Sequence, residues 1–410
     1  MADLSTVGGV IEAPRPEAGQ PVLRWSSRTH SVEGVEMELA RIWGSISKTT
    51  MGADGAEERH VAARSSVMNL VVIAGRGETG ERAAAIVQGL SGRHPSRTLI
   101  VSPADPDGPS WLDAQIQAHC IMPSATAPET CAELIYLTVG GEAGQHLAGI
   151  VAPLLIHDLP VLVWWPAEPR FESPQAQGLL EMADRILVDA SIWAGDGLAR
   201  LQAMAGFAGS AQVAISDFAL LRQERWREAI ASTFDRPDLR PYLRGIREVT
   251  VFYSARDTAT GVTNVVKPLY HAAWIASRLG WSVDRTLEPR PEEEGGYDAL
   301  MSDGRRHVAI GLRPTPSPLR PGTTVGVDLL CARRGSELLA INVTAHAEGV
   351  TVRASLDGDA LPERRFLSPR RTEAELLAET IESVGRDKIS GAALAMAARL
   401  SGAESVAARR

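Results

Sequence analysis

The chain has 410 residues, of which 44% are hydrophobic and 22% are charged, so its composition is that of a folded, water-soluble protein and excludes a disordered one. At roughly 150 residues per domain, this length predicts two or three domains. The net charge of −8 gives no long-range attraction to nucleic acid or anionic lipid, which argues against a role on either.

No stretch is predicted to span a membrane, because the most apolar one, residues 147–166, is interrupted by prolines, a histidine and an aspartate. The N-terminus lacks the basic start and continuous apolar run of an export signal, so we expect a cytoplasmic protein. The three cysteines, Cys120, Cys131 and Cys331, match no zinc-binding spacing. We expect reduced thiols and not a disulfide framework.

The first 50 residues are expected to form a tail and one helix, because residues 1–21 show no periodicity and apolar residues recur at helical spacing over residues 35–46. Further on, short apolar runs alternate with helical patterns. The expected strands are MNLVVIA, TLIVS, IQAHCIM, ELIYLTV, PVLVWW and RILVDAS, with helices after the first run and over residues 144–156. This alternation predicts an α/β fold with a mainly parallel, doubly wound, Rossmann-like sheet.

A second α/β region is expected after the proline-rich stretch WWPAEPRFESPQ, which places domains over residues 51–165 and 166–400. The run RILVDAS leaves open whether the first sheet extends past this boundary. Residues 218–233 predict one amphipathic helix. The runs TTVGVDLLCA and ELLAINVTA predict a hairpin, and a C-terminal helix is expected from Thr372, with Glu375 completing a capping box.

A glycine motif, Gly75-x-Gly77-x-x-Gly80, lies between an expected strand and an expected helix, where dinucleotide-binding proteins hold a pyrophosphate. The ribose-binding acid that should follow about 20 residues on is missing, because the chain there reads His94-Pro95-Ser96-Arg97. The three glycines are therefore weak cofactor-binding candidates, and a tight turn explains them as well. We expect no cofactor.

Two stretches of the first region are candidates for binding another molecule. In RHPSR, residues 93–97, the arginines suit an anion clamp or a protein contact, and a solvated turn fits them too. In HDLPVLVWWP, residues 157–166, adjacent tryptophans point to opposite faces of a strand, so either one lines a crevice or both are buried under helices. The partner-binding candidates are Arg93, His94, Arg97, His157, Asp158, Trp164 and Trp165.

Catalytic motifs are missing from the sequence. It contains no nucleophile elbow, no zinc-protease motif and no phosphate loop, which argues against an enzyme and a metal site. We interpret the charged residues around RILVDAS as structural ion pairs and His271 as a packed residue. The basic pairs are either solvated turns or contacts for an acidic partner: Arg333-Arg334, Arg364-Arg365 and Arg370-Arg371.

The order of several stretches resembles that of the glucose-6-phosphate dehydrogenase assembly protein family, OpcA. These stretches are MNLVVIA, RHPSR, PLLIHDLPVLVWWP, DRILVDAS, RWREAIASTFD and AWIASRLGW. The resemblance implies a non-catalytic cytoplasmic partner of glucose-6-phosphate dehydrogenase that favours the active oligomer of the enzyme at the entry of the oxidative pentose phosphate pathway. The alternatives are an NAD(P)-dependent oxidoreductase built on the glycine motif and a Rossmann-like enzyme that binds a sugar phosphate or nucleotide.

Overall fold

The structure is a computed structural model that describes residues 9–10, 20–46, 50–51, 57–58, 63–64, 66–74, 77–122, 130–255, 262–333, 337–383 and 387–402. The chain forms two compact units. The first comprises Met1–Val188 and Glu373–Val384, and the second comprises Asp189–Thr372 and Gly385–Arg410. Among the described residues, no helix is both long and apolar enough to cross a membrane.

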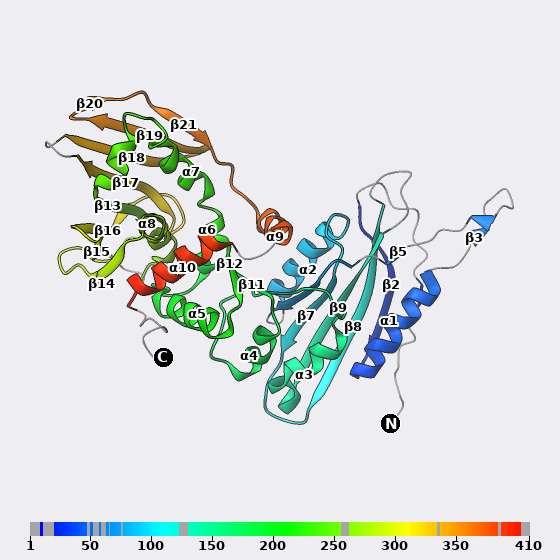
Figure 1. Ribbon diagram of the computed structural model, residues 1–410. Coiled ribbons are helices and arrows are strands. Elements are labelled where there is room, and N and C mark those ends of the chain that lie inside the picture. Colours follow the sequence, from blue (N-terminus) through cyan, green and yellow to red (C-terminus); the bar gives the residue numbers. More distant parts are fainter. Residues whose placement is uncertain are drawn as a thin grey trace. The chain divides into compact units, whose positions relative to one another are not determined.

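The first unit is built on a mixed sheet with the strand order β1-β2-β8-β9-β7-β6-β10-β11 (Figure 1). The five strands from β9 to β11 in this order pair in parallel, and β8 joins β9 in antiparallel register. The strands are β1 (Gly9–Val10), β2 (Val22–Thr29), β6 (Asn69–Ile73), β7 (Arg97–Pro103), β8 (Trp111–Ile121), β9 (Thr130–Gly140), β10 (Val161–Trp164) and β11 (Arg185–Val188). The short strand β5 (Ala63–Arg64) pairs with β9, and β3 (Thr50–Met51) pairs with β4 (Glu57–Glu58).

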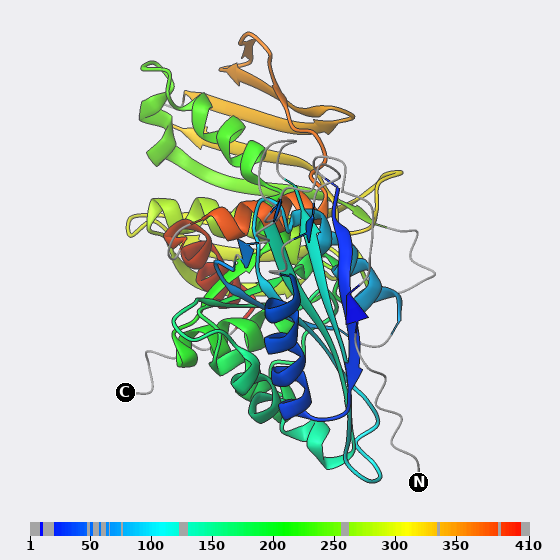
Figure 2. The ribbon, with the colours of Figure 1, turned by 90° about the vertical axis from the view of Figure 1, so that its right-hand side faces the viewer.

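Helices pack on this sheet. α1 (Val32–Ile46) lies along β2 and β8, as Figure 2 shows, and α2 (Glu78–Leu90) contacts β7. The helix expected over residues 144–156 is instead three short segments, η1 (Gly141–Gln145), α3 (Leu147–Val151) and η2 (Ala152–Leu154), since Pro153 removes a backbone donor. α4 (Pro174–Glu181) contacts α3, and α9 (Glu373–Glu382) contacts α2.

Continuous apolar runs mark the central strands of this sheet. Every residue of β6 and of β11 is buried, as expected for parallel strands that are covered on both faces. The α/β fold with a parallel-rich, Rossmann-like sheet is confirmed. The run RILVDAS supplies β11, which pairs with β10 and so belongs to the first sheet. The domain boundary expected after residue 165 stays a prediction.

The second unit contains a sheet with the order β14-β15-β16-β13-β17-β18-β19-β20, in which β21 also pairs with β19. All its pairs are antiparallel except β13 with β16. The strands are β13 (Ile246–Ala255), β14 (Ser282–Pro289), β15 (Tyr297–Ser302), β16 (His307–Pro316), β17 (Thr324–Ala332), β18 (Leu338–His346), β19 (Gly349–Leu356), β20 (Asp359–Ala360) and β21 (Arg364–Leu367). The expected hairpin is β17 and β18, and residues 334–336 of its turn lie outside the described residues.

The other elements of this unit are mainly helical: η3 (Ala190–Ile192), α5 (Leu198–Ala211), β12 (Ala214–Asp217), α6 (Phe218–Leu221), α7 (Glu224–Thr233), η4 (Arg240–Gly245), α8 (Val266–Leu279) and α10 (Lys388–Leu400). α8 contacts β13, β16 and β17, while α7 contacts β18, β19 and β21. The helix expected over residues 218–233 is broken between α6 and α7. Gln223, at the break, turns its side chain to Lys267 and donates to its carbonyl at 2.5 Å.

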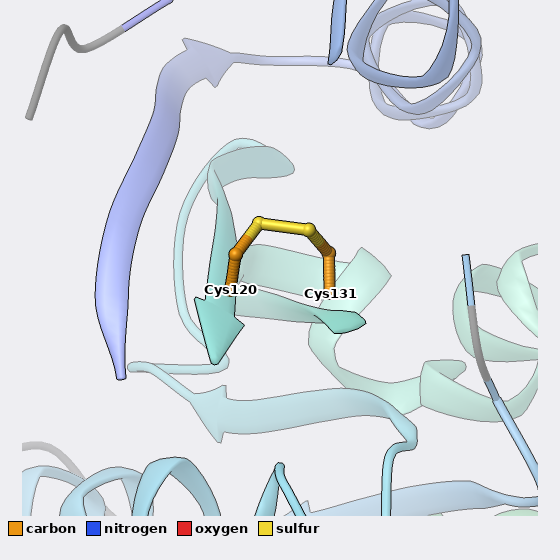
Figure 3. Close-up of a disulfide and its surroundings, with 2 residues drawn as sticks. All are labelled: Cys120 and Cys131. Atoms are coloured by element: carbon orange, nitrogen blue, oxygen red, sulfur yellow. A yellow bond between two sulfur atoms is a disulfide. The ribbon is translucent and has the colours of Figure 1, made fainter. Parts of the chain in front are cut away.

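Cys120 and Cys131 form a disulfide, so the expectation of three reduced thiols was wrong (Figure 3). The two residues are register partners on β8 and β9, and their Cα atoms are 4.0 Å apart. Strand pairing, which the cysteine spacing does not reveal, brings the sulfurs together. Cys331 is a free thiol in the core of the second unit, and burial raises its pKa to about 12.

Reduction of this disulfide is expected to lower the free energy of unfolding by about 2–3 kcal/mol, because the bond closes a loop with a sequence separation of 11. The measurement is urea unfolding with and without dithiothreitol. The variant Cys331→Ala should respond to the reductant as the wild type does, whereas Cys120→Ala/Cys131→Ala should not respond. Equal stability of the wild type with and without reductant would contradict the prediction.

Candidate functional site

Two loops of the first unit meet at the edge of the sheet where its parallel strands begin. The backbone N–H of Val67 donates to the Pro95 carbonyl at 3.0 Å, and that of Asn69 donates to the Pro160 carbonyl at 2.8 Å. The start of β6 therefore holds the loop that contains RHPSR on one side and the loop that precedes β10 on the other. The two stretches that the sequence singled out are neighbours in this unit.

The buried side-chain amide of Asn69 fixes the loop before β10. The Asn69 side chain donates to the Ile156 carbonyl at 2.9 Å and accepts from the Ile156 N–H at 2.8 Å. His157 and Asp158 follow and are both exposed. Asp158 has a φ of 65°, a left-handed conformation that aspartate and asparagine tolerate better than most residues. The loop thus presents both side chains to solvent on a fixed backbone.

The RHPSR loop is held by α9. Arg93 Nη2 lies 2.6 Å from Glu382 Oε1, and His94 Nε2 lies 3.1 Å from the same oxygen. At the other end of α9, Glu373 pairs with Arg82 of α2 at 3.3 Å. The Arg93 side chain is 70% exposed and that of His94 only 11%. We call Arg93, His157 and Asp158 the edge surface.

Arg97 lies in the core and not on the edge surface. It is the register partner of Glu133 on the neighbouring strand β9, and its Nε donates to that carboxylate. Its Nη1 donates to the Leu154 carbonyl at 2.8 Å, and Trp43 Nε1 donates to Glu133 at 2.5 Å. Arg97 and Glu133 are 7% and 1% exposed. This geometry gives Arg97 a structural role, and partner binding by it remains an untested prediction.

Trp164 and Trp165 are both buried, at 1% and 8% exposure, as one of the two interpretations of the sequence expected. Trp164 ends β10, and the Trp165 ring lies 6.3 Å from that of Phe171. The two rings contribute to the core of the first unit, and a contact of either with a partner stays a prediction.

The glycine motif is only partly described, because Gly75 lies outside the described residues. Gly77 precedes α2 with a φ of 90°, a conformation that favours glycine, and Gly80 is buried in the first turn of the helix. The first acidic residue after β7 is Asp105, which lies 25 positions after Gly80. Its side chain accepts a hydrogen bond from the backbone N–H of Asp107 at 3.0 Å, within its own loop. The observed geometry fits a tight strand-to-helix turn.

A second polar group, centred on Asp217, is buried in the second unit. Asp217 ends β12, and its Oδ1 accepts from the N–H groups of Ala190 at 3.0 Å and Ala219 at 2.8 Å. Its Oδ2 accepts from the Tyr270 hydroxyl at 2.6 Å. Burial raises the pKa of Asp217 to about 7, the nearby Asp189 adds to this effect, and the hydrogen bonds oppose it.

Asp189 lies beside this carboxyl and is ion-paired. It accepts from Arg222 Nη1 at 2.8 and 2.9 Å and from the Ser191 hydroxyl at 2.5 Å, and it is 6% exposed. The sequence suggested structural ion pairs for Asp189, and its partner is Arg222. The Asp189–Arg222 ion pair therefore connects the loop after β11 to the break between α6 and α7.

α8 contributes two basic side chains one turn apart, Lys267 and His271. Burial lowers the pKa of Lys267 to about 8, and Arg222, Arg320 and Arg370 add to this effect against the opposing influence of Asp189. His271 is fully buried, and its ring lies 5.2 Å from that of Trp226. Neither ring nitrogen has a hydrogen-bond partner in the part of the chain that is described. Burial holds the pKa of His271 well below its usual value, so the ring is neutral.

The sequence did not reveal this second group, because Asp189, Asp217, Arg222 and Lys267 come from segments that only the fold brings together. The one local signal is an aspartate directly after or at the end of a strand, at Asp189 and Asp217, where each caps a short helix. Among the described residues, no cluster of histidine, cysteine, aspartate and glutamate could hold a metal ion.

Known proteins match this chain along most of its length. A family model described as the glucose-6-phosphate dehydrogenase subunit N-terminal domain matches residues 87–205, and the corresponding C-terminal domain matches residues 213–394. Proteins that carry the name OxPP cycle protein OpcA are 30% identical over 198 residues in Synechocystis sp. and 26% identical over 323 residues in Nostoc punctiforme. These alignments cover 48% and 75% of this chain but 40% and 65% of the relatives, so the chain matches less than two thirds of their length.

Among solved structures, KijD10, a 3-ketoreductase from Actinomadura kijaniata, resembles this chain with a TM-score of 0.44 and 13% identity over 82% of this chain and 96% of that one. A likeness of this degree says nothing about the chemistry of this chain. The two family models, by contrast, together match more than half of its residues. The chain therefore belongs to the OpcA family, described as glucose-6-phosphate dehydrogenase subunit.

Proposed function

We propose that the protein is a non-catalytic partner of glucose-6-phosphate dehydrogenase that binds the enzyme and favours its active oligomer. The observation that carries this proposal is the match to both domains of the family, over residues 87–205 and 213–394. The lack of catalytic motifs in the sequence supports the non-catalytic role.

An activator of this kind acts only if it binds one state of the enzyme more tightly than the other. Coupling free energies of about 1–3 kcal/mol are typical and correspond to roughly 5- to 150-fold differences in affinity. We place the contact on the edge surface, because Arg93, His157 and Asp158 are exposed on loops that the hydrogen bonds of β6 hold in place. Preformed loops lose little conformational entropy on binding.

The proposal includes a cytoplasmic location. In a reducing compartment, glutathione and thioredoxin attack accessible disulfides. Cys120 and Cys131 are both 0% exposed, so their sulfurs are shielded from such thiols in the folded protein. The disulfide is therefore compatible with this location.

The edge surface is tested with the variant Arg93→Gln/His157→Ala/Asp158→Asn, in which asparagine preserves the left-handed backbone at residue 158. We expect its Kd for the purified dehydrogenase to rise at least about tenfold, which corresponds to about 1.4 kcal/mol. The matched control is Arg170→Gln, an exposed arginine six positions beyond the carboxyl end of β10, at the opposite edge. It should bind as the wild type does.

The outcomes separate the function from the contact face. Wild-type protein that leaves both the oligomeric state and the kcat/KM of the dehydrogenase unchanged would reject the proposed function. Substrate turnover by the isolated chain with NAD or NADP would reject the non-catalytic role. If the wild type activates the enzyme and the triple variant binds with unchanged Kd, only the edge surface is rejected.

A further inference from the structure

The second unit gathers basic side chains from four separate segments around the first turn of α8. Lys267 is the second residue of this helix and is half-buried. Arg222 follows α6, Arg320 lies in the loop between β16 and β17, and Arg370 follows β21. Each of the three arginines is close enough to Lys267 to affect its ionisation. The side chains of Asn264 and Arg371 show how the segments are held together.

Asn264 joins two of these segments, the start of α8 and the Arg320 loop, to the residues that follow Asp189. Its Nδ2 donates to the carbonyls of Ala190 at 2.9 Å and Trp193 at 3.0 Å, and its Oδ1 accepts from the N–H of Val266 at 3.0 Å. Its carbonyl faces Gly322, where an added Cβ would lie 2.6 Å from the oxygen. Gly322 therefore lets the Arg320 loop pack directly against the start of α8, beside the segment that carries Asp189.

Arg371 holds the fourth segment. Its Nη1 donates to Glu224 Oε2 at 3.3 Å, and its Nη2 donates to the Leu221 carbonyl. Leu221 directly precedes Arg222. The segment that carries Arg370 is thereby held against the segment that carries Arg222.

The charges in this cluster do not balance. Asp189 pairs with Arg222, and Glu224 pairs with Arg371. Arg320 and Arg370 are exposed, and their side chains form no hydrogen bond or ion pair in the described parts of the chain. The ammonium group of Lys267 also makes neither within these parts. Burial lowers its pKa to about 8, the three arginines add to this effect, and Asp189 opposes it. Within the described residues, Lys267, Arg320 and Arg370 thus lie in one region without an ion-pair partner of their own, and the mutual repulsion of the three cations would be relieved by an anion bound among them.

We propose that Lys267, Arg320 and Arg370, which we call the cationic cluster, bind the phosphate group of a small phosphorylated metabolite. Arginine forks donate two parallel hydrogen bonds to phosphate oxygens, and a lysine ammonium serves as a point charge beside them. A half-buried lysine and two exposed arginines, on segments that the contacts of Asn264 and Arg371 hold in one region, suit a compact anionic group. Nucleic acid fits less well, because the chain as a whole carries a net charge of −8. This inference goes beyond the proposed function and does not depend on it.

The lysine content of the chain allows a direct test. Lysine occurs only at positions 48, 267 and 388, so acylation by an N-hydroxysuccinimide ester can be followed at each site by mass spectrometry. The isolated full-length chain is labelled at pH 7.5 in the presence of inorganic phosphate, pyrophosphate or glucose 6-phosphate, with chloride at equal ionic strength as the reference. Lys388 is exposed at the start of α10 and serves as the internal control.

We expect at least one of the three phosphate compounds to slow labelling of Lys267 in a saturable way while Lys388 is unaffected. The variants Arg320→Gln and Arg370→Gln should each raise the concentration needed for half-protection about tenfold. The control Arg278→Gln, an exposed arginine in the last turn of the same helix, should not change it. Both Arg320 and Arg370 are exposed, so folding should be retained, which circular dichroism checks.

Three results would overturn the proposal. The first is equal slowing at Lys267 and Lys388. The second is no protection of Lys267 by any of the three compounds at about 10 mM, roughly tenfold above the upper end of typical KM values. The third is protection that is unchanged in both arginine variants. Stronger protection by glucose 6-phosphate than by inorganic phosphate would identify a sugar phosphate as the ligand. Equal protection by both would identify free phosphate as sufficient.

Discussion

Replacement of Arg97 by methionine is expected to lower the free energy of unfolding of the first unit by about 3–5 kcal/mol, the usual cost of breaking a buried ion pair. Glu133 is 1% exposed and would lose both the hydrogen bond and the opposite charge of Arg97, while the hydrogen bond from Trp43 would remain. The Leu154 carbonyl would also lose its donor. Urea unfolding followed by circular dichroism and tryptophan fluorescence measures the change.

A double variant tests the cause. In Arg97→Met/Glu133→Gln the buried charge is removed while an acceptor for Trp43 remains, so a large part of the lost stability should return. The matched control is Arg93→Gln, which breaks the exposed pair with Glu382 and should cost less than about 1 kcal/mol. A loss below 1 kcal/mol in Arg97→Met would show that Glu133 is not held as a buried carboxylate.

The variant Asp217→Asn should become more stable relative to the wild type as the pH rises. In the folded protein the pKa of Asp217 is about 7, against an ordinary 3.8. Between these values the folded state binds more protons than the unfolded state, so the contribution of Asp217 to stability falls with rising pH and is lost above about pH 7. The difference in unfolding free energy between variant and wild type should therefore increase by about 3 kcal/mol from pH 5 to pH 8.

Two histidines change the free energy of unfolding in the opposite direction as the pH rises. For this reason the variant is compared with the wild type at each pH. Burial lowers the pKa of His119 to about 4 and that of His271 well below 6.5, so both make the protein more stable as the pH rises toward 6.5. They are present in both proteins and cancel in the comparison. The control Asp238→Asn changes an exposed carboxyl whose pKa is lowered. The difference in unfolding free energy between this variant and the wild type should stay constant from pH 5 to pH 8. A flat difference for Asp217→Asn would contradict the raised pKa.

The first sheet was predictable because its central strands are continuous apolar runs, and the run RILVDAS fits β11 for the same reason. The breaks within the expected helices were harder to predict. Residues 218–233 have a helical pattern throughout, and the chain nevertheless breaks at Gln223, whose amide bonds to a carbonyl 44 positions away. Periodicity reports local preference and carries no information on such distant partners.

The candidate sites also contain some residues whose position could be predicted from the sequence and others whose position could not. Residues of the edge surface could be chosen from the sequence, because charged residues in loops next to strand ends are usually exposed. The burial of Arg97 could not be predicted, since its partner Glu133 becomes adjacent only through the register of β7 with β9. The cationic cluster depends on Asn264, Gly322 and Arg371, which connect segments spread over residues 189–371.

The position of α9 has a consequence for biosynthesis. This helix pairs with Arg82 and Arg93 of the first unit, yet the chain encodes it after almost all of the second unit. As the polypeptide leaves the ribosome, the part of α2 that contacts α9 stays uncovered until the residues of α9 have emerged. A fragment that stops at Val188 lacks this cover permanently, so the isolated N-terminal portion should be less soluble than the same portion supplied with residues 373–384 as a separate peptide.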